Sequence, residues 1–175
     1  LPIYFGLLSA EAEALNPGFF KRMRTAFPQV TVKLGASLDG RTAMASGESQ
    51  WITSPEARRD VQRLRARHDA VLSSAETVLA DGASLNVRWD ELPASVKAVY
   101  PKETLRQPLR VIVDSQNRLT PDLPLFQSDS PVLLARHKVD GDWPAWVQQL
   151  TLPLLDGKLD LVSLFMLLAK QNINS

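Results

Sequence analysis

Leu109-Arg-Val-Ile-Val-Asp-Ser115 is the most informative stretch of this 175-residue chain. Four of its first five residues are aliphatic, a pattern typical of a strand that is buried on both faces of a parallel sheet. Asp114 and Ser115 follow at the carboxyl end of this strand, where open α/β sheets present their ligand contacts. An aspartate at the end of a strand also forms turns, so the pattern does not decide whether Asp114 is a turn former or a binding residue.

Outward from this strand, the chain alternates between strand patterns and helix patterns. This alternation predicts an α/β domain with a largely parallel central sheet. The other predicted strands are residues 30–34, residues 132–135 and a short buried strand at residues 69–73. The predicted helices are residues 54–67, 143–150 and 159–171, together with two short helices between Ala10 and Met23.

The predicted helix 54–67 begins at a capping signal and carries many arginines. Thr53 can cap its first turn, and Glu56 can complete a capping box. The arginines can form a solvated face, or one or two of them, with Arg88, can hold a substrate phosphate in bidentate fashion. Trp51, just before the cap, is either a core anchor or a flat wall against a heteroaromatic ring.

The composition sets aside several classes of protein. A hydrophobic content of 45% and a net charge of +1 predict one globular domain and indicate neither nucleic acid nor an anionic membrane as a partner. The chain has no cysteine, and neither His68 nor His137 has a second ligand at metal-binding spacing, so we expect no metal site. The start lacks a signal-peptide pattern and no apolar run is long enough to span a bilayer, so a cytoplasmic protein is expected.

The usual phosphate-binding signatures are absent from the sequence, which contains neither G-x-G-x-x-G nor G-x-x-x-x-G-K-[ST]. A nucleotide therefore has to bind in another way. The G-x-S-x-G elbow is absent as well, so a hydrolase triad is not expected.

Two neighbouring motifs resemble one enzyme family. Residues 33–43 (KLGASLDGRTA) and 47–54 (GESQWITS) are similar to the C-terminal domain of the bifunctional riboflavin-biosynthesis deaminase/reductase. The similarity continues through residues 57–60, 77–81 and 110–115 and covers nearly the whole chain. It implies a dihydrofolate-reductase-like, three-layer α/β fold, with NADPH lying across the strand ends.

The resemblance also implies a reaction, the NADPH-dependent reduction of 5-amino-6-(5-phosphoribosylamino)uracil to 5-amino-6-(5-phosphoribitylamino)uracil. The partner is then a phosphorylated pyrimidine, and the family further implies a homodimer through the reductase domain. Carried over by position, the cofactor contacts are Gly35, Trp51, Thr77, Asp81 and Ser115. The substrate contacts are Ser49, Arg65, Leu85 and Arg88. The candidates for polar groups near the reacting carbon are Lys33 and Asp81.

The same resemblance implies how the chain is organised. Residues 1–28 look like the lead-in from a deaminase domain that this chain lacks, and residues 29–175 look like the reductase domain. The family continues past the residues that match 173–175 into a strand and a turn that grips the cofactor phosphates. The expectation is therefore a reductase domain whose C-terminal strands are missing, with weak or no activity of its own.

Two other functions stay open at this point. One is another dihydrofolate-reductase-like reductase that acts on a pterin or a related substrate. The other is a non-catalytic remnant that binds a nucleotide, or a partner through an open sheet edge.

Overall fold

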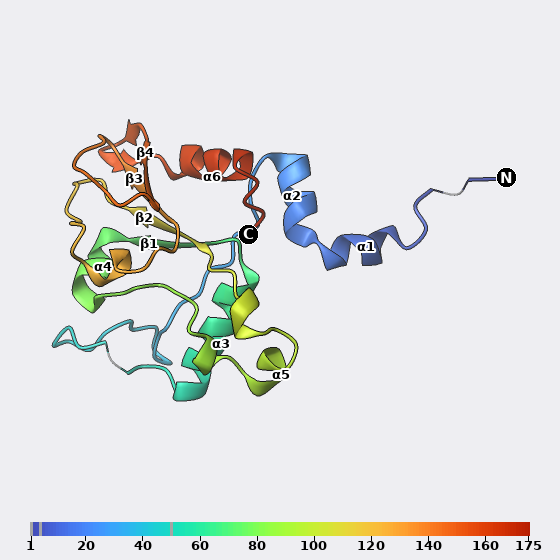
Figure 1. The fold of residues 1–175 in the computed structure, drawn as a ribbon, viewed down its shortest axis with the longest axis horizontal. Coiled ribbons are helices and arrows are strands. Elements are labelled where there is room, and N and C mark those ends of the chain that lie inside the picture. The colour runs from blue at the N-terminus through green and yellow to red at the C-terminus, as the bar shows by residue number, and fades with distance from the viewer. Residues whose placement is uncertain (1, 4, 50) are drawn as a thin grey trace.

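A computed structural model describes residues 2–3, 5–49 and 51–175, and its centre is a four-stranded sheet (Figure 1). All neighbouring strands are parallel and follow one another in chain order. The predicted α/β class with a parallel central sheet is therefore confirmed. Gln50, in the predicted loop before α3, lies outside the described residues. The four strands are β1 (Ala70–Ser74), β2 (Leu109–Val113), β3 (Val132–Arg136) and β4 (Val147–Thr151).

Helices, short helical turns and one small hairpin surround the sheet. The α-helices are α1 (Ser9–Leu15), α2 (Pro17–Thr25), α3 (Pro55–Arg67), α4 (Ala75–Asp81), α5 (Ala94–Lys97) and α6 (Leu161–Lys170). The 3-10 turns are η1 (Trp89–Glu91), η2 (Lys102–Thr104) and η3 (Pro124–Phe126). The antiparallel hairpin consists of β5 (Leu154–Leu155) and β6 (Lys158–Leu159).

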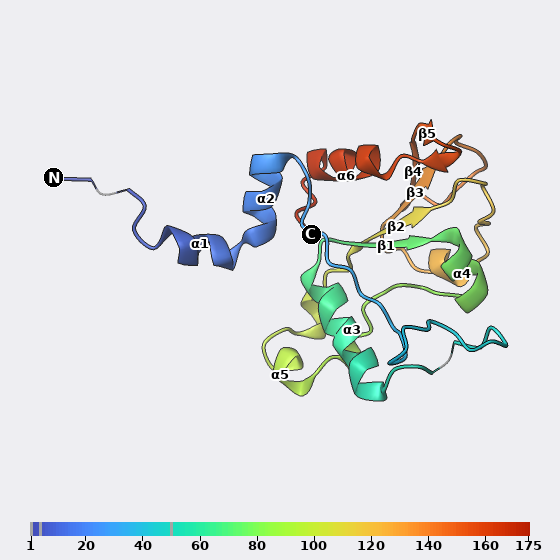
Figure 2. The ribbon, with the colours of Figure 1, turned by 180° about the vertical axis from the view of Figure 1, so that it is seen from behind.

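Two hydrophobic cores lie on opposite faces of the sheet, because successive side chains of a strand point to opposite sides. Ile112 and Leu134 belong to the core that contains α4. Val111 and Leu133 belong to the core that contains α6. Figures 1 and 2 show α4 and α6 on opposite sides of the strands. The expected three-layer arrangement is thus confirmed.

Residues 30–34 form no strand, contrary to the prediction. The segment is extended, but the described residues provide no strand that pairs with it. Alternation of side chains predicts which face is buried, but a strand also needs a backbone partner at hydrogen-bonding distance. The segment is tied to other parts of the chain by side-chain and terminal contacts instead: Gln29 N–H donates to the carbonyl of Asn174 at 2.7 Å, and the Thr31 hydroxyl lies 3.1 Å from His68 Nε2.

The predicted helix 143–150 is also wrong, because this region contains β4. Val147 and Leu150 pair in register with Val132 and Ala135 of β3. Pro144 has no N–H for a helical hydrogen bond, and valine packs well on a pleated sheet, so strand pairing outweighs the helical spacing of the apolar residues. By contrast, the predicted short N-terminal helices and the helices at 54–67 and 159–171 are confirmed as α1, α2, α3 and α6.

Two smaller expectations are corrected. Helix α3 is capped by Ser54 and not by Thr53, because the Ser54 hydroxyl accepts from Ala57 N–H at 3.2 Å. Strand β1 was expected to be buried, but Leu72 is 41% exposed. The cap is at Ser54 because Pro55 starts the helix immediately after it. Leu72 is exposed because β1 is an edge strand, with only β2 beside it among the described residues.

Helix α2 is anchored to the last residues of the chain, as Figures 1 and 2 both show. Arg22 Nε donates to Asn174 Oδ1 at 2.7 Å, and its Nη1 donates to Asn172 Oδ1 at 3.1 Å. Gly18 faces the main chain of Asn174 so closely that a Cβ on Gly18 would lie 2.8 Å from the Asn174 carbonyl oxygen. This contact therefore requires glycine for reasons of space.

We expect Gly18→Ala to lower the free energy of unfolding by about 1 to 3 kcal/mol, because the new methyl group meets main-chain atoms that cannot rotate away. Helix propensity alone predicts the opposite, a gain of about 1 kcal/mol from replacing glycine in a helix. Urea unfolding followed by circular dichroism measures the sign. A gain in stability would show that α2 is not packed against Asn174.

Asp69 joins the start of β1 to the end of the chain. Its carboxylate accepts from Asn174 N–H at 2.9 Å and from Arg106 Nη2 at 2.7 Å. Burial opposes ionisation of Asp69, but these hydrogen bonds and the charge of Arg106 outweigh it, and the pKa of the carboxyl lies below its usual value of 3.8. The ionised form is thus the one that the fold stabilises.

This lowered pKa gives a prediction about pH. A carboxyl with a depressed pKa in the folded state stabilises the fold above its unfolded pKa and loses that effect as the pH falls through the folded pKa. We therefore expect Asp69→Asn to destabilise the protein at pH 7, and the difference from the original chain to shrink as the pH falls below about 4. Thermal unfolding of both proteins across this range measures it. A difference that stays constant with pH would exclude the charge as its cause.

Candidate functional site

A groove of about 510 Å³ runs along the free edge of β1. The extended residues 28–33 form one wall, and β1 with parts of α3 and α6 forms the other. The groove exists because the described residues place no strand between this extended segment and β1. Its volume lies in the range of about 300 to 1,000 Å³ that is typical of ligand sites.

Four of the residues predicted for the site line this one groove, although they come from four separate segments. Lys33 lies on the extended segment, Arg65 on α3 and Thr77 on α4, and Leu85 follows α4. Leu85 is buried, while Lys33 is exposed along the groove. These four residues thus bring two cations, one hydroxyl and one apolar side chain to the groove.

Arg65 and Arg88 form a positively charged pair next to the groove. Burial lowers the pKa of the Arg65 guanidinium, and the nearby charge of Arg88 lowers it further. Arg88 is bound by a carboxylate of the same chain, since its Nε lies 2.6 Å from Glu91 Oε1 and its Nη2 donates to Oε2 at 3.0 Å. A bound anion would relieve the repulsion between the two arginines and would compete with Glu91 for Arg88.

Thr77 and Ser115 lie near the same edge of the sheet, because β1 and β2 are parallel and end in register at Ser74 and Val113. This is the carboxyl edge, where open α/β sheets bind ligands. Asp114, between β2 and Ser115, has a structural role. It is buried, accepts from the main-chain N–H groups of Arg118 and Leu119, and so is the turn former of the two alternatives.

The remaining predicted residues do not line the groove. Gly35 lies beside Lys33, and a Cβ on Gly35 would come within 3.2 Å of Lys33 Nζ. Trp51 is 69% exposed and stacks on the guanidinium of Arg58 at 4.2 Å from its ring centre, so it is no core anchor. Ser49 is exposed in the loop before Trp51, and Asp81 is exposed at the end of α4.

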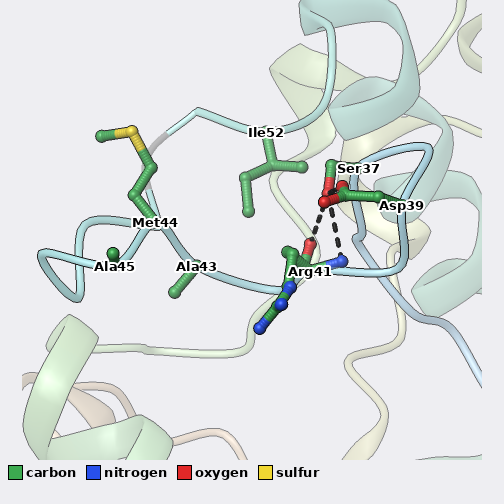
Figure 3. Close-up of a pocket in the computed structure, with 7 residues that line it drawn as sticks. All are labelled: Ser37, Asp39, Arg41, Ala43, Met44, Ala45 and Ile52. Atoms are coloured by element: carbon green, nitrogen blue, oxygen red, sulfur yellow. Dashed lines mark hydrogen bonds between the residues drawn. The ribbon is translucent and has the colours of Figure 1, made fainter.

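A second pocket of about 440 Å³ is formed by the loop between Ser37 and Ile52 (Figure 3). The Ser37 hydroxyl lies 2.5 Å from Asp39 Oδ1 and accepts from Arg41 N–H at 3.1 Å, which fixes the turn. None of the predicted site residues lines this pocket. Ser37, Asp39 and Arg41 belong to the motif 33–43, and none of the three was among the predicted site residues.

Neither metal-binding clusters nor membrane spans are found in the described part of the chain. Residues 2–3, 5–49 and 51–175 contain no group of three His, Asp or Glu side chains that could hold a metal ion. No helix in these ranges is long and apolar enough to cross a bilayer. His68 donates from Nδ1 to the Leu64 carbonyl at 2.7 Å, and His137 lies 3.4 Å from the Leu152 carbonyl.

The fold and the groove define an α/β domain with a ligand-sized site beside the edge strand of a parallel sheet. Within that class, the chain belongs to the family described as the RibD C-terminal domain, which matches residues 28–175. The chain is 56% identical over 176 residues to the riboflavin biosynthesis protein RibD of Escherichia coli K12, covering 100% of this chain and 48% of the relative. It is 37% identical over 133 residues to a 5-amino-6-(5-phosphoribosylamino)uracil reductase of Buchnera aphidicola, covering 75% of this chain and 64% of the relative.

The structure resembles that of a diaminohydroxyphosphoribosylaminopyrimidine deaminase/5-amino-6-(5-phosphoribosylamino)uracil reductase from Thermotoga maritima. The TM-score is 0.76 at 29% identity, covering 97% of this chain and 44% of the other. This likeness confirms the dihydrofolate-reductase-like fold. The chain spans about half the length of the RibD relative from Escherichia coli.

Proposed function

We propose that the chain carries the reductase half of a riboflavin-biosynthesis enzyme and reduces 5-amino-6-(5-phosphoribosylamino)uracil to the phosphoribitylamino product. The observation that carries the proposal is that Lys33, Arg65, Thr77 and Leu85 line one groove. Membership of the RibD C-terminal domain family and the name of the Buchnera relative support it. Residues 1–28 are, in the same proposal, the lead-in from a preceding domain, and residues 29–175 belong to the reductase domain.

The residues of the groove suit NADPH and a phosphorylated pyrimidine. Lys33 and Arg65 offer positive charge to phosphates, Thr77 offers a hydroxyl, and the apolar wall suits flat rings. Gly35 has no side chain, so a ligand can approach its main chain beside Lys33. We assign cofactor contacts to Gly35, Trp51, Thr77, Asp81 and Ser115, and substrate contacts to Ser49, Arg65, Leu85 and Arg88.

The residues of the chain mainly orient the substrate and deliver a proton. NADPH, when bound, supplies a hydride to C1′ of the ribosyl group. Arg65 and Arg88 would hold the substrate phosphate at the mouth of the groove. As C1′ is reduced, its bond to the ring oxygen breaks and that oxygen takes up a proton. Of the two predicted polar groups near the reacting carbon, Lys33 lines the groove and Asp81 does not, so we assign the proton to Lys33.

A turnover assay tests the proposed function. The chain is incubated with NADPH and synthetic 5-amino-6-(5-phosphoribosylamino)uracil, and the ribitylamino product is detected by mass spectrometry. NADPH deuterated at the transferred position should place one deuterium on C1′. The Buchnera relative serves as the positive control for the substrate. Calorimetric titration of the same chain with each compound accompanies the assay, and binding of neither substrate nor NADPH, with the control active, would contradict the proposal.

The dephosphorylated substrate separates this proposal from a pterin-type reductase. The arginine pair predicts that removal of the phosphate weakens binding strongly. We also propose that the domain forms a homodimer, as the family resemblance implies, and light scattering after gel filtration tests this part separately.

A further inference from the structure

Residues 84–88 form a short segment whose main chain is held by side chains instead of by a helix or strand. The carbonyl of Ser84 accepts from Arg110 Nη1 at 3.1 Å, and the carbonyl of Asn86 accepts from Arg65 Nη1 at 3.0 Å. Gln107 binds both polar groups of Val87, accepting from its N–H at 2.8 Å and donating to its carbonyl at 3.0 Å. Side chains from other parts of the chain therefore hold the main chain of Ser84, Asn86 and Val87.

Gln62 holds the last residue of this segment. Its Oε1 accepts from Arg88 N–H at 3.0 Å. Gln62 is 1% exposed and is the one buried residue of α3, a helix whose other side chains are partly or fully exposed. A buried amide costs free energy unless its hydrogen bonds are made. The hydrogen bond from Arg88 N–H offsets part of the cost of burying Gln62.

The segment needs such bracing because its conformation is strained. Leu85 has a φ of 59°, in the left-handed region that leucine rarely adopts. Leu85 is nevertheless buried and lines the groove. Without the side-chain hydrogen bonds, the segment would relax toward commoner backbone angles and move both Leu85 and Arg88.

We propose that Gln62 and Gln107 are positioning residues for phosphate recognition. They hold the main chain of Val87 and Arg88 so that the Arg88 guanidinium stands beside Arg65 at the groove. Neither glutamine touches the ligand, and both act through Arg88. This inference rests on the proposed function, since it takes the arginine pair to be the phosphate site.

The chain offers a matched control for Gln107. Gln149, on β4 at the opposite end of the sheet, binds the main chain of Asp140 in the same way, accepting from its N–H at 3.1 Å and donating to its carbonyl at 2.9 Å. Gln107→Leu and Gln149→Leu therefore remove the same pair of main-chain hydrogen bonds from two different loops, and Gln149→Leu also removes an acceptor of Arg136 Nη1 at 3.1 Å. Gln62→Leu is the second test variant, and it keeps the side-chain volume while removing the acceptor for Arg88.

The experiment measures the binding of ribose 5-phosphate by calorimetry and the hydrogen exchange of the Arg88 amide by NMR, on the whole chain. We expect Gln107→Leu and Gln62→Leu each to weaken binding about tenfold and to speed exchange at Arg88, while Gln149→Leu leaves both unchanged. If Gln62→Leu does not fold, Gln107→Leu tests the inference alone, because Gln107 is only half-buried.

Two results would overturn the inference in different ways. Faster exchange with unchanged binding, or equal effects of Gln107→Leu and Gln149→Leu on binding, would show that the glutamines only support the fold. Failure of the original chain to bind ribose 5-phosphate would instead contradict the phosphate site of the proposed function, and the inference with it.

Discussion

Replacing Asp114 by alanine is expected to lower the free energy of unfolding by about 3 to 5 kcal/mol, because the buried guanidinium of Arg136 loses its buried counter-charge and keeps the half-exposed carboxylate of Asp140. Arg136 Nη2 donates to Asp114 Oδ2 at 2.8 Å, and both side chains are fully buried. The carboxylate also accepts from two main-chain N–H groups, of Arg118 and Leu119, which would lose their partner. Denaturant unfolding measures the loss.

An exposed ion pair provides the control for this prediction. Arg118 Nη1 lies 2.8 Å from Glu76 Oε2, and both side chains are largely exposed. Glu76→Ala should change the free energy of unfolding by less than about 1 kcal/mol, since exposed pairs are screened by water and salt. The pair joins the residue after β2 to the last residue of β3, and if Asp114→Ala cost no more than Glu76→Ala, the pair would not stabilise these strand ends.

Arg88→Ala should weaken the binding of a sugar phosphate by about 10- to 100-fold, the effect of losing one bidentate, charge-assisted contact. The stability of this variant should change little, because the Arg88 side chain is 54% exposed and, among residues 2–3, 5–49 and 51–175, forms an ion pair with the nearby Glu91 alone. Calorimetric titration with ribose 5-phosphate measures the effect.

Two further variants make the Arg88 prediction specific. Arg59→Ala removes an exposed arginine of α3 outside the groove and should leave binding unchanged. Glu91→Gln removes the carboxylate that occupies Arg88 and should tighten binding. Loss of binding in Arg59→Ala as large as in Arg88→Ala would point to general attraction by a positive surface, and weaker binding in Glu91→Gln would contradict competition for Arg88.

The sheet could be predicted from the sequence where strands are short, aliphatic and buried, as residues 109–113 and 132–135 show. The prediction failed where the outcome depends on a partner. Residues 30–34 alternate like a strand, but the part of the chain that the structure describes provides no neighbouring strand to pair with them. Residues 147–151 carry apolar residues at helical spacing and still form β4, because pairing with β3 decides the outcome.

The candidate site could be predicted as a set of residues but not as an arrangement. The family motifs pointed to Lys33, Arg65, Thr77 and Leu85, and the fold gathers them in one groove. The bond between Gln62 and Arg88 N–H joins residues 26 positions apart, and no local pattern predicts it. The ion pair between Glu91 and Arg88 could not be predicted either, because a sequence shows which residues are charged but not which of them form contacts.

The central claim is that the groove beside β1 is the ligand site. The most direct test is two-dimensional amide NMR of this chain during titration with NADPH. We predict that the shifts concentrate on the amides of Lys33, Thr77 and their neighbours along the groove. Shifts confined to the loop from Ser37 to Ile52, around the second pocket, or no saturable shifts at all, would contradict the claim.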